Sequence, residues 1–316
     1  MNKNNLQYSF CPIVKLFQQH TAKFVKKNCF IFLFLVVSFF CQAQRSEVGT
    51  LLGTSFYLGD LNSIPFRDAQ FAGGLVYKYN FTPRLALKAN ILFGKIAASD
   101  EKNFLTNAKG DILWDYRNRG LSFSSSITEI SAQVEINFFN VYNEGHKNQI
   151  SPYLFGGMAL FSFNPQADYV YKDTAGNVVK KSYDLQPIGT EIDRNTGMPT
   201  KYSLTGFAIP FGIGFKANIG RYVCVGAEWG MRFTFTNYLD DVGGLYYDMP
   251  LTASDVEKFF ADPSQNHKPD SQRYSTIRAD WYSFAGIIIT VRIGNEDRIC
   301  NVKTNVKLKH KQGRKR

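Results

Sequence analysis

Apolar and polar residues alternate in one segment after another between about residues 48 and 293, and this pattern restricts the fold more than any other feature. In a β-strand successive side chains point to opposite faces, so a period of two indicates strands with one apolar and one polar face. The clearest case is residues 130–138, where every second residue is apolar while Gln133 and Glu135 lie on the opposite face. The sequence therefore predicts an all-β protein.

The alternation predicts eight strands, an even number as a single-chain antiparallel barrel requires. The aromatic content of 15% with a mean hydropathy of -0.22 suits alternating strands better than helical membrane spans. We expect the apolar face to meet lipid and the polar face to line a lumen, giving an eight-stranded antiparallel transmembrane β-barrel. The expected strands are residues 48–59, 71–81, 85–93, 130–138, 153–163, 209–217, 223–235 and 281–293.

The connections between these strands alternate in length. Outer-membrane barrels have short periplasmic turns and long extracellular loops, so the pattern predicts that both chain ends are periplasmic. Turn residues around 173–177 predict a hairpin within one long loop, and Ser254 with Glu257 forms a capping-box pattern that predicts a short helix. The short connections are 82–84, 142–150 and 219–221, and the long ones are 99–120, 164–202 and 237–280.

Residues 1–44 have the parts of a secretory signal peptide: a basic region, an apolar stretch at residues 29–40, and small or polar residues before a cut after Gln44. An uncleaved membrane helix is the alternative, but the stretch is shorter than the roughly 20 residues that a bilayer span needs. A lipoprotein acylated at Cys41 is a further alternative, although Phe40 occupies a position that favours a small residue. Only Cys224 and Cys300 would remain after cleavage, which disfavours a disulfide framework.

The net charge of +11 is concentrated at the two ends of the chain, because residues 45–302 carry 25 basic and 26 acidic residues. We expect a barrel at 45–295 and a disordered basic periplasmic tail at 296–316. The tail is either a solvated appendage or a docking segment for an acidic partner or anionic lipid; nucleic acid is not expected in that compartment. Its basic residues are Lys303, Lys307, Lys309, Lys311, Arg314, Lys315 and Arg316.

Charged residues also occupy the expected lumen face. An eight-stranded barrel is only wide enough for its own side chains to fill, so we expect these charges to pair and close the lumen. A selective pore lined by the same charges is the alternative. The predicted network consists of Lys78, Lys88, Glu129, Glu135, Lys216, Glu228 and Arg232.

Catalytic and cofactor chemistry is not expected. The predicted topology separates His146, His267 and His310, which argues against a histidine-based dyad or metal site, so we expect no catalytic residue, metal, cofactor or small-molecule substrate. A barrel enzyme would have only His267 at the outer rim. Asp240 and Asp241 are either a solvated loop start or a pair of ligands for Ca²⁺.

Several segments carry a resemblance to a known family, and they occur in the order 121–131, 210–216, 236–242 and 281–282. Across residues 48–293 the chain resembles the PorG family, small outer-membrane barrels associated with type IX secretion and gliding motility. The resemblance implies a non-enzymatic role in which the barrel anchors or organises periplasmic secretion-ring proteins of the PorK/PorN type. The alternative is a surface-exposed binding or adhesion barrel that uses its long loops.

Overall fold

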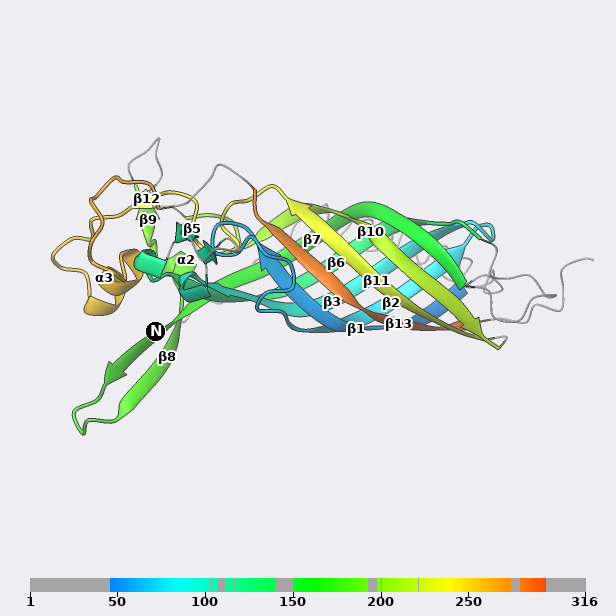
Figure 1. Ribbon diagram of the computed structural model, residues 1–316, viewed down its shortest axis with the longest axis horizontal. Helices are drawn as coiled ribbons and strands as arrows, with labels where there is room; N and C mark the ends of the chain where they lie inside the picture. Colours follow the sequence, from blue (N-terminus) through cyan, green and yellow to red (C-terminus); the bar gives the residue numbers. More distant parts are fainter. Residues whose placement is uncertain are drawn as a thin grey trace, which may run out of the picture. The chain divides into compact units, whose positions relative to one another are not determined.

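Eight long strands pair in antiparallel order and close into a ring (Figure 1). Closure is complete because β7 pairs with β6 along one edge and with β10 along the other. This confirms the predicted eight-stranded antiparallel barrel. In order around the ring the strands are β1 (Ser46–Leu58), β2 (Gln70–Asn80), β3 (Leu85–Ser99), β6 (Ser122–Asn137), β7 (Ile150–Lys172), β10 (Thr205–Ile219), β11 (Val223–Thr234) and β13 (Trp281–Ile293).

The computed structural model describes most of the chain between residues 46 and 293. The predicted signal peptide, the basic tail, His146 and His310 lie outside the described residues. No helix among the described residues is both long and apolar enough to cross a membrane. The described residues are 46–102, 104–106, 112–115, 117–139, 150–192, 198–199, 201–220, 222–273 and 279–293.

The alternation in the sequence becomes two faces of the barrel wall, as expected. Leu75 and Ile130 point outward and are 63% and 59% exposed, whereas Lys78 and Glu129 on the same two strands point inward and are buried. A continuous apolar outer surface of this kind is unfavourable in water and favourable in lipid. The outer wall is therefore the membrane-facing surface.

Exposed aromatic side chains mark both ends of this wall. Outer-membrane barrels carry aromatic residues at the two interfaces, where the rings contact lipid and headgroups together. Near the short turns the exposed rings are Phe81, Phe138, Phe139 and Tyr222; near the long loops they are Phe66, Phe71, Phe207 and Phe235. Phe66 packs at a tilt against the exposed Trp229 of β11 with ring centroids 5.6 Å apart, so the β1–β2 loop folds back onto the outer wall.

The two ends of the barrel differ in size. At the end we call the turn end, residues 81–84 join β2 to β3 and residues 220–222 join β10 to β11; Ser46 of β1 pairs there with Tyr79. The β6–β7 connection falls mostly outside the described residues. The opposite, loop end carries β4 (Phe104–Thr106), β5 (Ile112–Asp115), β9 (Glu191–Ile192), β12 (Leu245–Tyr246), α2 (Leu185–Ile188), α3 (Asp255–Ala261), η2 (Asp100–Lys102) and η3 (Arg117–Arg119).

Both local predictions for the long loops are confirmed. Residues 166–172 of β7 pair with β8 (Val178–Asp184) as a hairpin, which projects away from the other loops in Figure 1. Ser254 and Glu257 exchange hydrogen bonds at the start of α3 as a complete capping box. The two buried residues of this short helix are Phe260 and Ala261, and Phe260 belongs to the main cluster of buried apolar residues.

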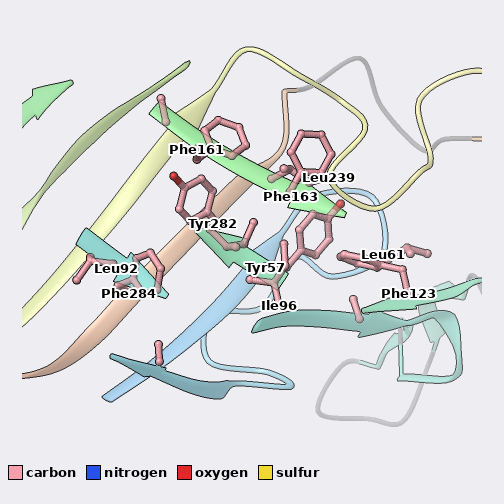
Figure 2. Packing of buried hydrophobic residues seen from close by; sticks show 14 of the residues in the cluster. Tyr57, Leu61, Leu92, Ile96, Phe123, Phe161, Phe163, Leu239, Tyr282 and Phe284 are labelled. Atoms are coloured by element: carbon pink, nitrogen blue, oxygen red, sulfur yellow. The ribbon is translucent and has the colours of Figure 1, made fainter. Parts of the chain in front are cut away.

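The apolar core fills the barrel near the loop end (Figure 2). Inward positions of several strands are aromatic or aliphatic there, including Tyr57, Ile96, Phe161 and Tyr282. Loop residues such as Leu239 enter the same cluster. Burial of these side chains joins the loops to the wall, so the loop end forms a packed cap, consisting of residues 59–69, 100–121, 185–204 and 235–280 where described.

Candidate functional site: the paired-charge lumen and its cap

Inward positions toward the turn end are charged rather than apolar, and Glu135 on β6 lies at their centre. Its Oε2 accepts a hydrogen bond from Lys78 Nζ at 2.9 Å, and its Oε1 accepts one from Lys216 Nζ at 2.6 Å. The three side chains are almost fully buried and come from β6, β2 and β10. One carboxylate thus joins three strands, no two of which are adjacent in the sheet.

A second pair crosses the lumen next to the first. Lys88 Nζ on β3 lies 2.5 Å from Glu228 Oε2 on β11, and the Tyr153 hydroxyl donates to the same oxygen at 3.0 Å. Lys88 also lies over the ring of Phe155, 3.9 Å from its centroid. Because these bulky side chains need room, Gly214 is required opposite Tyr153: a Cβ there would overlap the tyrosine ring.

The third pair lies where the charged layer meets the apolar core. Arg232 Nε donates to Glu129 Oε2 at 3.0 Å, and the Tyr282 hydroxyl donates to that oxygen at 2.9 Å. The guanidinium carbon lies 4.8 Å from the ring centroid of Phe284. All seven lumen charges that the sequence singled out are therefore buried inside the barrel, and each lies in an ion pair with another of them.

A fourth cluster escaped the sequence reasoning. Glu47 accepts from Asn80 Nδ2 at 3.1 Å and from the Thr290 hydroxyl at 2.8 Å, and Arg292 Nε lies 3.6 Å from its Oε1. Glu47 is at the start of the first strand and Arg292 at the end of the last, where alternation is weak. The predicted barrel did contain one indication of this cluster: closing an antiparallel ring makes the first and last strands neighbours, which brings Glu47 and Arg292 together.

The cap contains the acidic pair Asp240–Asp241, and its environment differs from either sequence interpretation. Both residues are buried, at 1% and 3% exposure, so the expectation of a solvated loop start is wrong. Protein donors replace water: Tyr57 and the Val242 amide bond to Asp240, while Thr190 and Tyr202 bond to Asp241. Within the described ranges, no group of three or more metal-binding side chains has the geometry of an ion site.

Glu191 and Arg273 form the ionic centre of the cap. Arg273 Nη1 lies 3.3 Å from Glu191 Oε1, and the backbone amides of Gly243 and Gly244 donate to the same carboxylate. Burial raises the pKa of Glu191 to about 7 despite these partners. Arg273 also donates to the Phe260 carbonyl at 2.8 Å, so one side chain joins β9 and α3.

His267 has polar neighbours that superficially suggest catalysis. Ser264 Oγ and Asp262 Oδ1 lie 2.9 and 3.0 Å from it, but both contact the same ring nitrogen, Nδ1. A serine–histidine–aspartate relay needs one partner on each nitrogen, so this arrangement does not provide one. The ring stacks on Tyr246 with centroids 4.1 Å apart, which gives it a packing role in the cap.

An antiparallel barrel with an apolar aromatic-banded wall, a charge-paired interior and a packed cap defines the class: a transmembrane β-barrel of the outer-membrane type with a filled lumen. The chain belongs to the family described as "Domain of unknown function (DUF6089)", whose model matches residues 26–192. No curated protein matches the sequence.

Several solved structures are similar at low sequence identity. The N-terminal β-barrel domain of Pseudomonas aeruginosa OprF is 9% identical, with a TM-score of 0.30 over 78% of this chain and 97% of that one. Neisserial surface protein A is 9% identical, with a TM-score of 0.35 over 78% and 96%. Ail of Yersinia pestis, solved with the heparin analogue sucrose octasulfate, is 9% identical with a TM-score of 0.33 over 78% and 96%. The fold class rests on this chain's own strand pairing.

Proposed function

We propose that the protein is a non-enzymatic component of the type IX secretion and gliding machinery that anchors or organises a periplasmic ring at the outer membrane. The observation that carries the proposal is the filled interior: Arg232, Tyr153, Tyr282, Lys78 and Lys88 are among the largest fully buried side chains. A barrel occupied by its own side chains suits a membrane anchor better than a conduit. The PorG-like segments supply the choice of machinery.

The end of the barrel at which the first strand begins and the last strand finishes supports the same role. The first strand, β1, begins at the turn end, where Ser46 pairs with Tyr79. The last strand, β13, finishes at the same end, where Val291 pairs with Val223. In an outer-membrane barrel that end is periplasmic, so the basic tail would extend toward a PorK/PorN-type ring. Its seven basic residues would favour an acidic partner surface and bind more weakly as salt increases.

The test is deletion of the gene followed by complementation with the full chain or with a chain truncated after Val302. We expect deletion to abolish secretion of type IX cargo and the full chain to restore it. The truncated chain should still show heat-modifiable barrel folding but recover less periplasmic ring protein by co-purification. Normal cargo secretion in the deletion strain would contradict the proposal; unchanged recovery of ring proteins at low salt would contradict only the role of the tail.

A surface-binding barrel is the second candidate, and the β7–β8 hairpin favours it. Val170 and Val178 are 56% and 68% exposed toward its tip, while Tyr169, midway along it, packs on Phe259 of α3. Exposed apolar residues on a supported hairpin suit contact with an external ligand. Replacing residues 168–182 with a short turn should abolish adhesion and spare cargo secretion under this hypothesis, with the reverse expected if the hairpin serves secretion.

A further inference from the structure

The hydroxyl of Tyr57 has three close polar partners in the cap. It lies 2.6 Å from Asp240 Oδ2 and 2.8 Å from Asp280 Oδ1, and it accepts a hydrogen bond from the Asp60 amide at 2.8 Å. Tyr57 lies at the loop end of β1. Asp240 and Asp280 lie in the long connection between β11 and β13, Asp240 near its start and Asp280 at its end. The tyrosine and both carboxyls are essentially inaccessible to water.

The number of hydrogens restricts the protonation state of this cluster. A tyrosine hydroxyl has one hydrogen to donate, so it can serve only one of two carboxylate oxygens. If both carboxyls were ionised, one carboxylate oxygen would face the phenol oxygen with no hydrogen between them. If one carboxyl is protonated, it donates to Tyr57, Tyr57 donates to the other, and every contact is satisfied.

The remaining oxygens have their own donors, which hold both carboxyls in place. The Leu239 amide donates to Asp280 Oδ2 at 3.0 Å, and the Val242 amide donates to Asp240 Oδ1 at 2.9 Å. Gly59 makes room, because a Cβ at that position would overlap the Tyr57 hydroxyl and the Asp280 carboxyl. The cluster is therefore fixed from the wall, the β1–β2 loop and the β11–β13 connection together.

We propose that Asp240 and Asp280 bind one proton between them through Tyr57, and that this shared proton latches the β11–β13 connection to β1. The charged groups nearby do not replace it. Arg119 Nη2 donates to the backbone oxygen of Asp60, and Arg273 pairs with Glu191 and Asp241. Among the described residues, neither Asp240 nor Asp280 is in an ion pair with a cation.

The electrostatics act in the direction that the geometry requires. Burial raises the pKa of Asp240, and repulsion from Asp280 and Asp60 raises it further. Burial and repulsion from Asp60 likewise raise the pKa of Asp280. Raising the pH until the proton is lost leaves two buried anions with only the Tyr57 hydrogen between them, so the connection should separate from β1 while the wall stays folded.

The test compares the full mature protein with Asp240→Asn, Asp280→Asn and the double variant, reconstituted in lipid vesicles. The amide of an asparagine side chain donates a hydrogen bond as a protonated carboxyl does. Each single variant therefore satisfies the hydrogen bonds of the Tyr57 hydroxyl without a shared proton. The double variant gives Tyr57 two amide donors besides the Asp60 amide and leaves its own hydrogen without an acceptor. Hydrogen exchange at the Leu239 and Val242 amides should therefore be unchanged in the singles and about tenfold or more faster in the double.

Infrared difference spectra at neutral pH detect the proton directly. The spectrum of the wild type minus that of either single variant should contain the carbonyl stretch of a protonated carboxylic acid. On alkaline titration this band should disappear together with the protection of the Leu239 amide from hydrogen exchange. Asp262→Asn is the matched control: partial burial acts to raise the pKa of Asp262, but hydrogen bonds from His267 and Ser264 outweigh it and hold the pKa below its ordinary value. Absence of the acid band, or a double variant as protected as the singles, would overturn the proposal. Heat-modifiable migration verifies that each variant has a folded barrel.

Discussion

Arg232 on β11 and Glu129 on β6 are 103 residues apart in sequence and bond across the lumen at 3.0 Å. The side chains are 1% and 0% exposed, so neither charge has access to water. Removing one member of such a pair leaves an uncompensated buried charge, whereas removing both need not be costly. The pair therefore matters as a unit to the stability of the barrel.

Arg232→Met should destabilise the barrel by about 3–5 kcal/mol, and Glu129→Leu by a similar amount. The double variant should be much less destabilised than the sum, because no unpaired charge remains. Equilibrium urea unfolding from lipid vesicles measures all three. Additive losses would show that the two side chains are not coupled across the lumen.

The wild-type barrel should show no stable ohmic conductance in planar bilayers. The lumen is occupied by Glu135 with its two lysines and by the pair Lys88–Glu228, all buried. An eight-stranded barrel has no further width for a water column beside them. Insertion is verified by heat-modifiable migration of the same sample, and a reproducible open channel would refute the filled-lumen interpretation.

Arginine placed at Ile213, which faces the lipid near the middle of β10, should destabilise the barrel by about 2–4 kcal/mol. Arginine at Val134, which faces the lipid three residues before the end of β6, should also destabilise it, but by less, because the cost falls toward the interface. Val134 and Ile213 are 45% and 47% exposed on the outer wall. Gln133→Ser, at the inward position next to Val134, should cost much less since the change stays within the polar lumen. Folding into vesicles compares the three, and equal effects on the two faces would mean that the wall faces are assigned wrongly.

Much of the wall could be predicted from the sequence because alternation is a local property. Glu129, Gln133 and Glu135 share a face by spacing alone, and the face follows from the apolar residues between them. Which charges meet was not predictable in this way. Lys88 and Glu228 are 140 residues apart, and their contact depends on the order of strands around the ring.

The structure of the cap, in contrast to the wall, could not be predicted from local sequence patterns. Asp240 and Asp241 lie in a polar connection, and local pattern favours solvent for such residues. Their burial depends on Tyr57, 183 residues away from Asp240, and on Thr190, 51 residues away from Asp241. No periodicity links these positions, so the three-dimensional packing of loops decided the outcome. The hairpin and the capping box were predictable because their signals lie within a few residues.

Glu191 should make the stability of the cap depend on pH between about 4.5 and 7. Its folded pKa of about 7 lies above the ordinary value of 4.5, so the folded cap binds its proton more tightly than the unfolded cap does. Such a group contributes stability that is complete below pH 4.5 and is lost as pH rises to 7, by about 3 kcal/mol in total at about 1.4 kcal/mol per pH unit.

Hydrogen exchange at the Gly243 and Gly244 amides, which bond to Glu191, measures this local stability once intrinsic exchange rates are corrected for pH. Protection should be higher at pH 5 than at pH 7.5. Glu191→Gln should flatten the profile over this range, because the amide cannot ionise, while Glu257→Gln at the exposed start of α3 should leave it unchanged. Protection that increases with pH in the wild type would mean that the ionised pair with Arg273 dominates over burial of Glu191.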